Sequence, residues 1–159
     1  MLSIAITLFA ALISGTFAAP ASGRTAIQPP SGSGQIIVSQ TQLRVTGCLN
    51  AQGLWNVADD CATFSGDGAG DISGPEGFLA LTEDSEITTS SSSYETTWLG
   101  YYLNGNTSAT YLSADKTTSD ASGQILLHAD YVPSGTETVS IHGSSSEGDV
   151  AVYLSWIAQ

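Results

Sequence analysis

Two histidines, His128 and His142, are the side chains best suited to proton-transfer chemistry in this chain. General acid–base catalysis needs two groups that titrate near the working pH and face one substrate. Neither histidine lies in a catalytic motif. The sequence around His142, which continues with Gly143 and Ser144, matches no catalytic motif. The chain also has no Gly-x-Ser-x-Gly elbow that could position a serine nucleophile. We therefore expect no catalytic residues and no enzymatic activity.

Acidic residues are the other candidates for chemistry. Asp67, Asp71 and Glu76 could present oxygens to calcium from one Gly-rich segment, but their spacing matches neither a helix-pair calcium loop nor a nonapeptide repeat. Glu83 and Glu86 are more typical of a solvated acidic face than of a glycosidase pair. Zinc would need clustered cysteines and histidines, and the two histidines stand apart in the sequence. We favour solvated loops and expect no metal and no cofactor.

Aromatic side chains are the strongest indication of a function. Flat rings stack on pyranose sugars while neighbouring polar groups bond the hydroxyls, although any single ring more often fills a core. Trp156 falls on the apolar face of the last expected strand, so we place it in the core. Consecutive strand residues point to opposite faces, so Tyr101 or Tyr102 should reach the surface. We expect Trp98, Tyr101 and Tyr102 to form an exposed ligand-binding patch.

The charge of the chain limits its partners. The formal net charge is −12, and Arg24, Arg44 and Lys116 are the only Lys or Arg residues. Binding to nucleic acid draws its affinity from cations that neutralise phosphates, usually six or more. The sequence therefore predicts no nucleic-acid partner at neutral pH.

The chain begins with an apolar run that predicts export. Residues 2–17 carry no charged side chain and are followed by Ala18 and Ala19, which suit signal peptidase. The run is shorter than the ~20 residues needed to cross a bilayer, and no later stretch is long enough. We expect a signal peptide over residues 1–18, with cleavage after Ala19 or Ala21 and a retained N-terminal anchor as the alternatives. We also expect an extracellular protein without a membrane segment, and a flexible Pro/Gly/Ser leader over residues 19–34.

The remaining residues, 35–159, alternate short apolar runs with turn clusters and show no sustained helical period. This pattern predicts one all-β domain, an antiparallel sandwich or barrel. We expect residues 66–77 and 83–93 to be surface loops. The expected strands cover residues 35–39, 42–49, 54–57, 62–65, 78–82, 94–103, 109–113, 124–129, 138–142 and 150–157.

A stapled β-hairpin is expected in the segment with the only two cysteines, Cys48 and Cys61. Residues 50–53 form a turn between two apolar runs. Export favours a disulfide, and a closed loop of about 14 residues stabilises the fold by roughly 3 kcal/mol in the chain-entropy model. Asn106-Thr107-Ser108 is a glycosylation acceptor sequence beside an expected turn, with Asn106 as the modified residue.

Five patches of the chain resemble one known family. Residues 47–49, 53–55 and 61–64 are similar to the opening of the C-terminal accessory domain of fungal secreted ribonucleases of the ribonuclease T2 family, and residues 128–136 and 150–156 are similar to its end. The resemblance implies a non-catalytic appendage that holds an enzyme to a cell wall or another surface. We expect this chain to be such an appendage without the nuclease.

The nuclease motif of that family is not reproduced. The enzymes cut RNA with histidines in motifs such as His-Gly-Leu-Trp-Pro, whereas this chain has Gln52-Gly53-Leu54-Trp55-Asn56. Our first hypothesis is a secreted, non-catalytic module that binds a cell-wall polysaccharide or another surface. The alternatives are a secreted effector-type protein that engages a protein partner, and a ribonuclease-related hydrolase.

Overall fold

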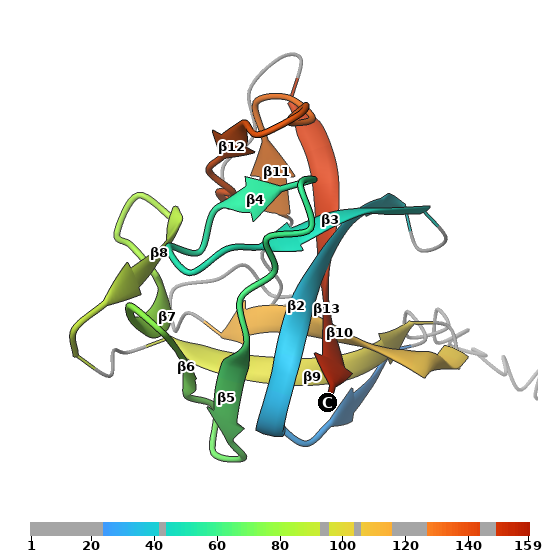
Figure 1. Cartoon of the computed structure of the whole chain (residues 1–159). Helices are drawn as coiled ribbons and strands as arrows, with labels where there is room; N and C mark the ends of the chain where they lie inside the picture. Colours follow the sequence, from blue (N-terminus) through green and yellow to red (C-terminus); the bar gives the residue numbers. More distant parts are fainter. Residues whose placement is uncertain (1–23, 42–43, 93–95, 104–105, 116–126, 144–148) are drawn as a thin grey trace, which may run out of the picture.

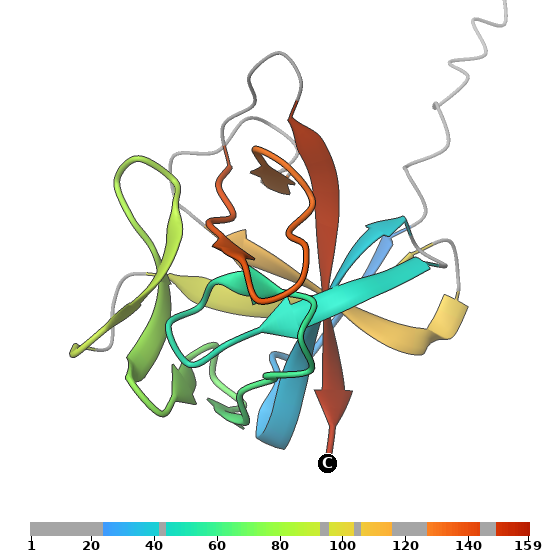
Figure 2. The same cartoon turned by 45° about the horizontal axis from the view of Figure 1, so that its top comes forward.

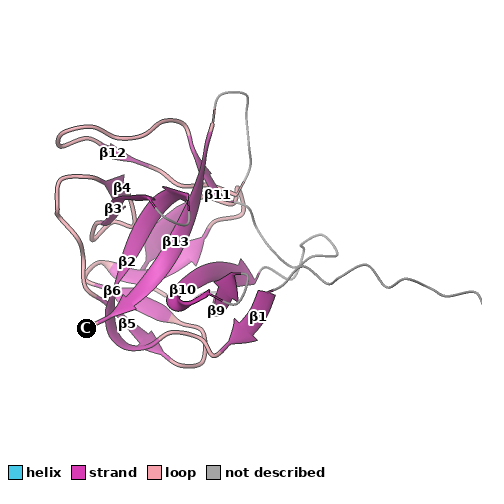
Figure 3. Cartoon of the chain, turned by 90° about the vertical axis from the view of Figure 1, so that its right-hand side faces the viewer, coloured by secondary structure: helices cyan, strands magenta, loops and turns pink. Residues whose placement is uncertain are grey.

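The structure is a computed structural model that describes residues 24–41, 44–92, 96–103, 106–115, 127–143 and 149–159. This part of the chain consists of strands and loops and contains no helix (Figure 3). The predicted all-β, antiparallel fold is confirmed. The thirteen strands are β1 Arg24–Ile27, β2 Ser31–Thr41, β3 Arg44–Leu49, β4 Trp55–Asn56, β5 Phe64–Asp67, β6 Ile72–Gly74, β7 Gly77–Leu81, β8 Ile87–Ser90, β9 Thr97–Leu103, β10 Asn106–Asp115, β11 Leu127–Ala129, β12 Thr138–Val139 and β13 Val150–Ala158.

One antiparallel sheet connects these strands in the order β1-β9-β10-β13-β2-β5-β6-β7-β8. A side branch leaves β2 through β3, β4 and β12, and β11 pairs with β13. The long strands β2 and β13 run side by side across β9 and β10 (Figure 1). In Figure 2, β13 extends from the region of β11 and β12 down to the C-terminus. The strand β13 therefore pairs with β11 near its beginning and with β10 and β2 along the rest of its length.

The sheet curls around its core without closing into a barrel. The β6–β7 end returns to β9, where the Trp98 amide donates to the Gly70 carbonyl at 2.8 Å. The Trp98 indole Nε1 donates to the Leu79 carbonyl at 2.9 Å, and the Leu81 amide donates to the Thr96 hydroxyl at 3.0 Å. These hydrogen bonds join the two ends of the sheet where regular strand pairing is missing.

Alternating side chains fill the enclosed core, as the sequence of the last strand predicts. Val152, Leu154 and Trp156 of β13 are buried on one face, next to Ile36 and Val38 of β2. Burial of such side chains is the main favourable contribution to folding. The other members of the core cluster are Leu49, Trp55, Phe64, Ile72, Leu79, Leu81, Ile87, Trp98, Leu112, Ala114, Leu127, Ala129, Val139 and Ile141.

The stapled hairpin is also confirmed. Strands β3 and β4 pair, and a disulfide joins Cys48 to Cys61. Asn50 builds the turn, because its side-chain oxygen accepts from the amides of Gln52 and Leu54, both at 3.0 Å. Gly53 follows with φ of 80°, a conformation that favours glycine. The disulfide is consistent with an extracellular protein.

Three strands were not predicted. The structure places β6 and β8 in the two segments expected to be loops, and β1 in the segment expected to be a flexible leader. The expected boundary at residue 35 is also too late, because β2 begins at Ser31. The strands β1, β6 and β8 have only three or four residues each, too few to show an apolar alternation, so their formation depends on pairing with neighbouring strands.

No helix among the described residues is both long enough and apolar enough to cross a membrane. The predicted signal peptide, residues 1–18, lies outside the described part, so cleavage and export stay predictions.

Candidate functional site

A groove of about 600 Å³ lies between the β1–β2 connection and the strands β10 and β13. This volume is within the range of small-ligand sites. The described residues that line it are uncharged and mix apolar rings with hydroxyl and amide groups. They are Gln28, Pro29, Pro30, Ser31, Thr110, Trp156 and Ala158.

The wall formed by the two prolines is held in place by backbone contacts from the chain next to β5. The Gly68 amide donates to the Pro30 carbonyl at 3.0 Å. Gly66 permits this approach, since a Cβ at that position would lie 2.4 Å from the Pro30 oxygen. Proline also fixes its own φ, so the wall is rigid before any ligand binds.

The floor of the groove is Trp156, which packs over Gly34 of the neighbouring strand. A Cβ at Gly34 would lie 2.5 Å from Trp156 Cζ2, so only glycine leaves room for the ring. Thr110 is the register partner of Trp156 on β10, which places the threonine beside the indole. Trp156 is 7% exposed. It therefore belongs to the core, as predicted, and also lines the groove.

The structure does not bring the three predicted ligand-binding aromatics together at the surface. Trp98 is fully buried and its indole N–H is bonded to the Leu79 carbonyl, so its expected exposure is wrong. Tyr101 is half-buried on the opposite face of β9. The backbone of Tyr102 pairs with Thr25, and its side chain lies outside the described part. Alternation along one strand separates Trp98 from Tyr101.

Tyr101 belongs instead to a row of tyrosines across three strands. Its ring centroid lies 5.9 Å from that of Tyr111, which lies 6.2 Å from that of Tyr153. The central Tyr111 is 2% exposed, and its two neighbours are half-buried. Burial raises the pKa of the Tyr111 hydroxyl, and the neighbouring Tyr153 raises it further. The row lies on the face of the sheet away from Leu112 and Leu154 of the core.

A second polar site contains both histidines of the chain, which are far apart in the sequence but neighbours in the structure. His128 of β11 forms an isolated antiparallel bridge with His142, with amide-to-carbonyl distances of 2.8 and 2.9 Å. Their rings stack with centroids 6.5 Å apart. The bridge joins segments on either side of β12, so spacing along the chain gave no indication of it.

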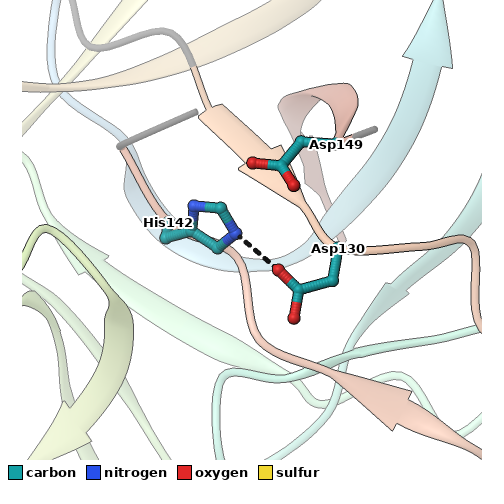
Figure 4. Close-up of side chains that lie close together, drawn as sticks. All are labelled: Asp130, His142 and Asp149. Atoms are coloured by element: carbon teal, nitrogen blue, oxygen red, sulfur yellow. Dashed lines mark hydrogen bonds and ion pairs between the residues drawn. The ribbon is translucent and has the colours of Figure 1, made fainter. Parts of the chain in front are cut away.

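Two carboxylates face His142 in this cluster (Figure 4). His142 Nε2 lies 3.2 Å from Asp130 Oδ1, and the carboxylate of Asp149 is the third member of a group whose ligand atoms all lie within 4.8 Å of one another. The pairing of Ala129 with Val150 explains why the aspartates meet, since each is the next residue beyond this pair. His128 and Asp130 are two residues apart and so lie on the same face of the strand, and this spacing is the sequence signal that could have indicated a polar cluster here.

The predicted calcium candidates do not form such a group in the described part of the chain. Asp67 Oδ1 accepts from the amides of Ala69, Gly70 and Asp71 at 2.7, 2.9 and 3.0 Å. The hydrogen bond from Ala69 is the largest cause of the lowered pKa of this carboxyl, and the other two act in the same direction. Asp67 therefore shapes a turn.

Asn106, the predicted glycosylation site, is the first residue of β10 and pairs with Leu103. Its side chain lies outside the described part, so glycosylation stays a prediction.

The chain matches no protein-family model, and comparison with curated proteins and with solved structures also finds no match. The similarity to the ribonuclease T2 accessory domain thus depends on the sequence patches alone. It stays a prediction.

Proposed function

We propose that this protein is a secreted, non-catalytic module that binds a neutral polysaccharide in the groove floored by Trp156. The observation that carries the proposal is that the described residues lining this groove are all uncharged, in a chain whose net charge is −12. Sugar sites combine an aromatic or apolar surface with a few fixed hydroxyl and amide groups. Trp156 and the prolines supply the first, and Gln28, Ser31 and Thr110 supply the second.

The net charge selects among polymers. An acidic protein repels polyanions, including nucleic acids and acidic glycans, over the distance set by salt screening. A neutral glucan or chitin meets no such barrier. The resemblance to surface-holding accessory domains leads to the same substrate class, independently of the groove.

Pre-organisation also supports this proposal. Gly66 and Gly68 fix the proline wall, and Gly34 fixes the indole, so little side-chain or loop freedom is lost on binding. A shallow site with few polar contacts gains affinity mainly by avoiding this entropic cost. Repetition of sugars along an insoluble polymer would increase retention further.

Retention on insoluble glucan, on chitin and on cell walls tests the proposal. We expect Thr110→Val and Gln28→Ala to weaken retention by about fivefold to tenfold each, since each removes one hydrogen-bonding group worth about 1 kcal/mol. Thr89→Val on β8 is the matched control, because it makes the same chemical change outside the groove. If none of these polymers retains the wild-type protein, the proposal is contradicted and a protein partner is favoured.

The paired histidines make the hydrolase alternative worth testing directly. Two imidazoles beside a carboxylate can exchange protons, but Asp130 and Asp149 place negative charge where a phosphodiester would have to bind. We expect no RNA cleavage above buffer between pH 4 and pH 7. Cleavage that His142→Gln abolishes would overturn the non-catalytic assignment.

A further inference from the structure

The cluster of Asp130, His142 and Asp149 has the composition of a metal site. It offers one imidazole nitrogen and two carboxylates, and these ligand atoms lie within 4.8 Å of one another. Calcium and magnesium are normally bound by oxygen atoms alone, whereas imidazole together with carboxylate suits zinc and its neighbours. We propose that these three residues bind one divalent transition-metal ion of the zinc class.

The separation of the donor atoms supports this proposal. Zinc–nitrogen and zinc–oxygen bonds of about 2.0–2.2 Å place neighbouring ligand atoms of a tetrahedral site about 3.3–3.6 Å apart. His142 Nε2 and Asp130 Oδ1 lie 3.2 Å apart, close to this separation. The carboxylate of Asp149 lies within 4.8 Å of both of these atoms.

Strand pairing holds the three donors in position. Asp130 directly follows β11, Asp149 directly precedes β13, and these strands pair through Ala129 and Val150. The backbone of His142 is bonded on both sides to His128 of β11. The donors therefore come from three chain segments that are already joined, which lowers the entropic cost of collecting them around an ion.

The second histidine of the chain, His128, has one buried ring nitrogen. This nitrogen, His128 Nδ1, has no hydrogen-bond partner among the residues that the structure describes. Buried polar atoms in native proteins nearly always have a hydrogen-bond partner. The ring centroids of His128 and His142 lie 6.5 Å apart, so a second imidazole lies near the cluster, although it is not one of the three grouped ligands.

Three protein ligands leave part of the coordination sphere open. Sites of this kind keep at least one position for water or for another ligand, in contrast to closed structural zinc sites with four protein ligands. Two carboxylates balance the charge of the dication, and the acidic chain attracts cations to its surface. The site is separate from the Trp156 groove, with which it shares none of the described lining residues.

Zinc titration of tag-free, chelator-treated protein tests the proposal, followed by isothermal calorimetry and by the visible absorption of the cobalt(II) form. We expect one ion per chain, and a rise in Tm of about 5–10 °C when zinc is about 100-fold above its Kd. Asp149→Asn and His142→Gln should weaken binding at least tenfold and abolish the cobalt spectrum. Asp59→Asn, an exposed change of the same kind away from the cluster, should bind zinc as the wild type does.

Near-UV circular dichroism of the metal-free variants controls for folding. No binding of zinc or cobalt by the wild type at 1 mM would overturn the proposal, and so would unchanged affinity in both folded cluster variants. If the wild-type protein is retained on a polymer in the presence of chelator but binds no metal, the metal proposal fails while the groove proposal stands. If the wild-type protein binds zinc but is retained on no polymer, the groove proposal fails while the metal proposal stands.

Discussion

The groove and the histidine–aspartate cluster are assembled in different ways. The groove depends on close backbone approach, since Gly34 and Gly66 admit the indole of Trp156 and the carbonyl of Pro30. The cluster depends on polar side chains at the ends of paired strands, where β11 meets β13. The groove carries no charge among its described residues, whereas the cluster collects two carboxylates and two imidazoles. The comparison teaches that one sheet carries an uncharged groove and a charged cluster at separate positions.

The largest expected effect acts on both regions together. Replacing Cys48 and Cys61 by serine opens the loop between them, which should lower the free energy of unfolding by about 3 kcal/mol. Urea unfolding of the double variant measures this loss. A change below about 1 kcal/mol would show that the staple contributes little, and reduced wild-type protein provides the matched comparison.

A second change should affect the groove and spare the cluster. Gly34→Ala places a methyl group against the indole of Trp156, and such overpacking costs about 1–3 kcal/mol. We expect lower stability, altered tryptophan fluorescence and lost polymer retention, with zinc binding unchanged. Gly32→Ala controls for glycine replacement at an open position, where a Cβ meets nothing within 4 Å, although the φ of 75° adds its own strain. Full polymer retention by Gly34→Ala would contradict the proposed floor.

A third change should affect metal binding by the cluster and leave the groove intact. Asp130 is 73% exposed, so Asp130→Asn should cost the metal-free protein no more than about 1 kcal/mol. It should nevertheless remove the zinc-dependent rise in Tm, because one of three ligands is lost. Thermal unfolding with and without zinc checks both statements. An undiminished zinc effect would show that Asp130 is not a ligand.

The smallest effect lies in neither region. The pKa of Asp67 is lowered below its ordinary 3.8, first of all by the Ala69 amide. Its stabilisation of the turn is therefore complete above about pH 4 and is lost as the pH falls through the lowered value. Carboxyl NMR titration should give a midpoint below 3.8 for Asp67. A midpoint at or above that value would contradict the three amide hydrogen bonds.

The parts of the fold that could be predicted from the sequence are those encoded by local patterns. Alternation in β13 placed Val152, Leu154 and Trp156 in the core, and the turn chemistry of Asn50 and Gly53 indicated the hairpin. The strands β1, β6 and β8 could not be predicted, since each has only three or four residues and becomes a strand through its pairing with β9, β5 or β7.

The candidate sites were harder to predict because both depend on tertiary contacts. Trp98 resembled a surface aromatic in sequence, but its indole N–H has a buried partner in Leu79, a residue on a distant strand. The pairing of His128 with His142 depends on a bridge between segments on either side of β12. Spacing along the chain indicates neither contact.

Polymer retention by the matched threonine variants tests the central claim most directly. Wild-type protein and Thr89→Val should be retained equally on a neutral insoluble glucan or chitin, and Thr110→Val should be retained about fivefold to tenfold less. Equal retention of all three folded proteins would contradict a groove beside Trp156 as the binding site. Retention of none would contradict polysaccharide binding itself.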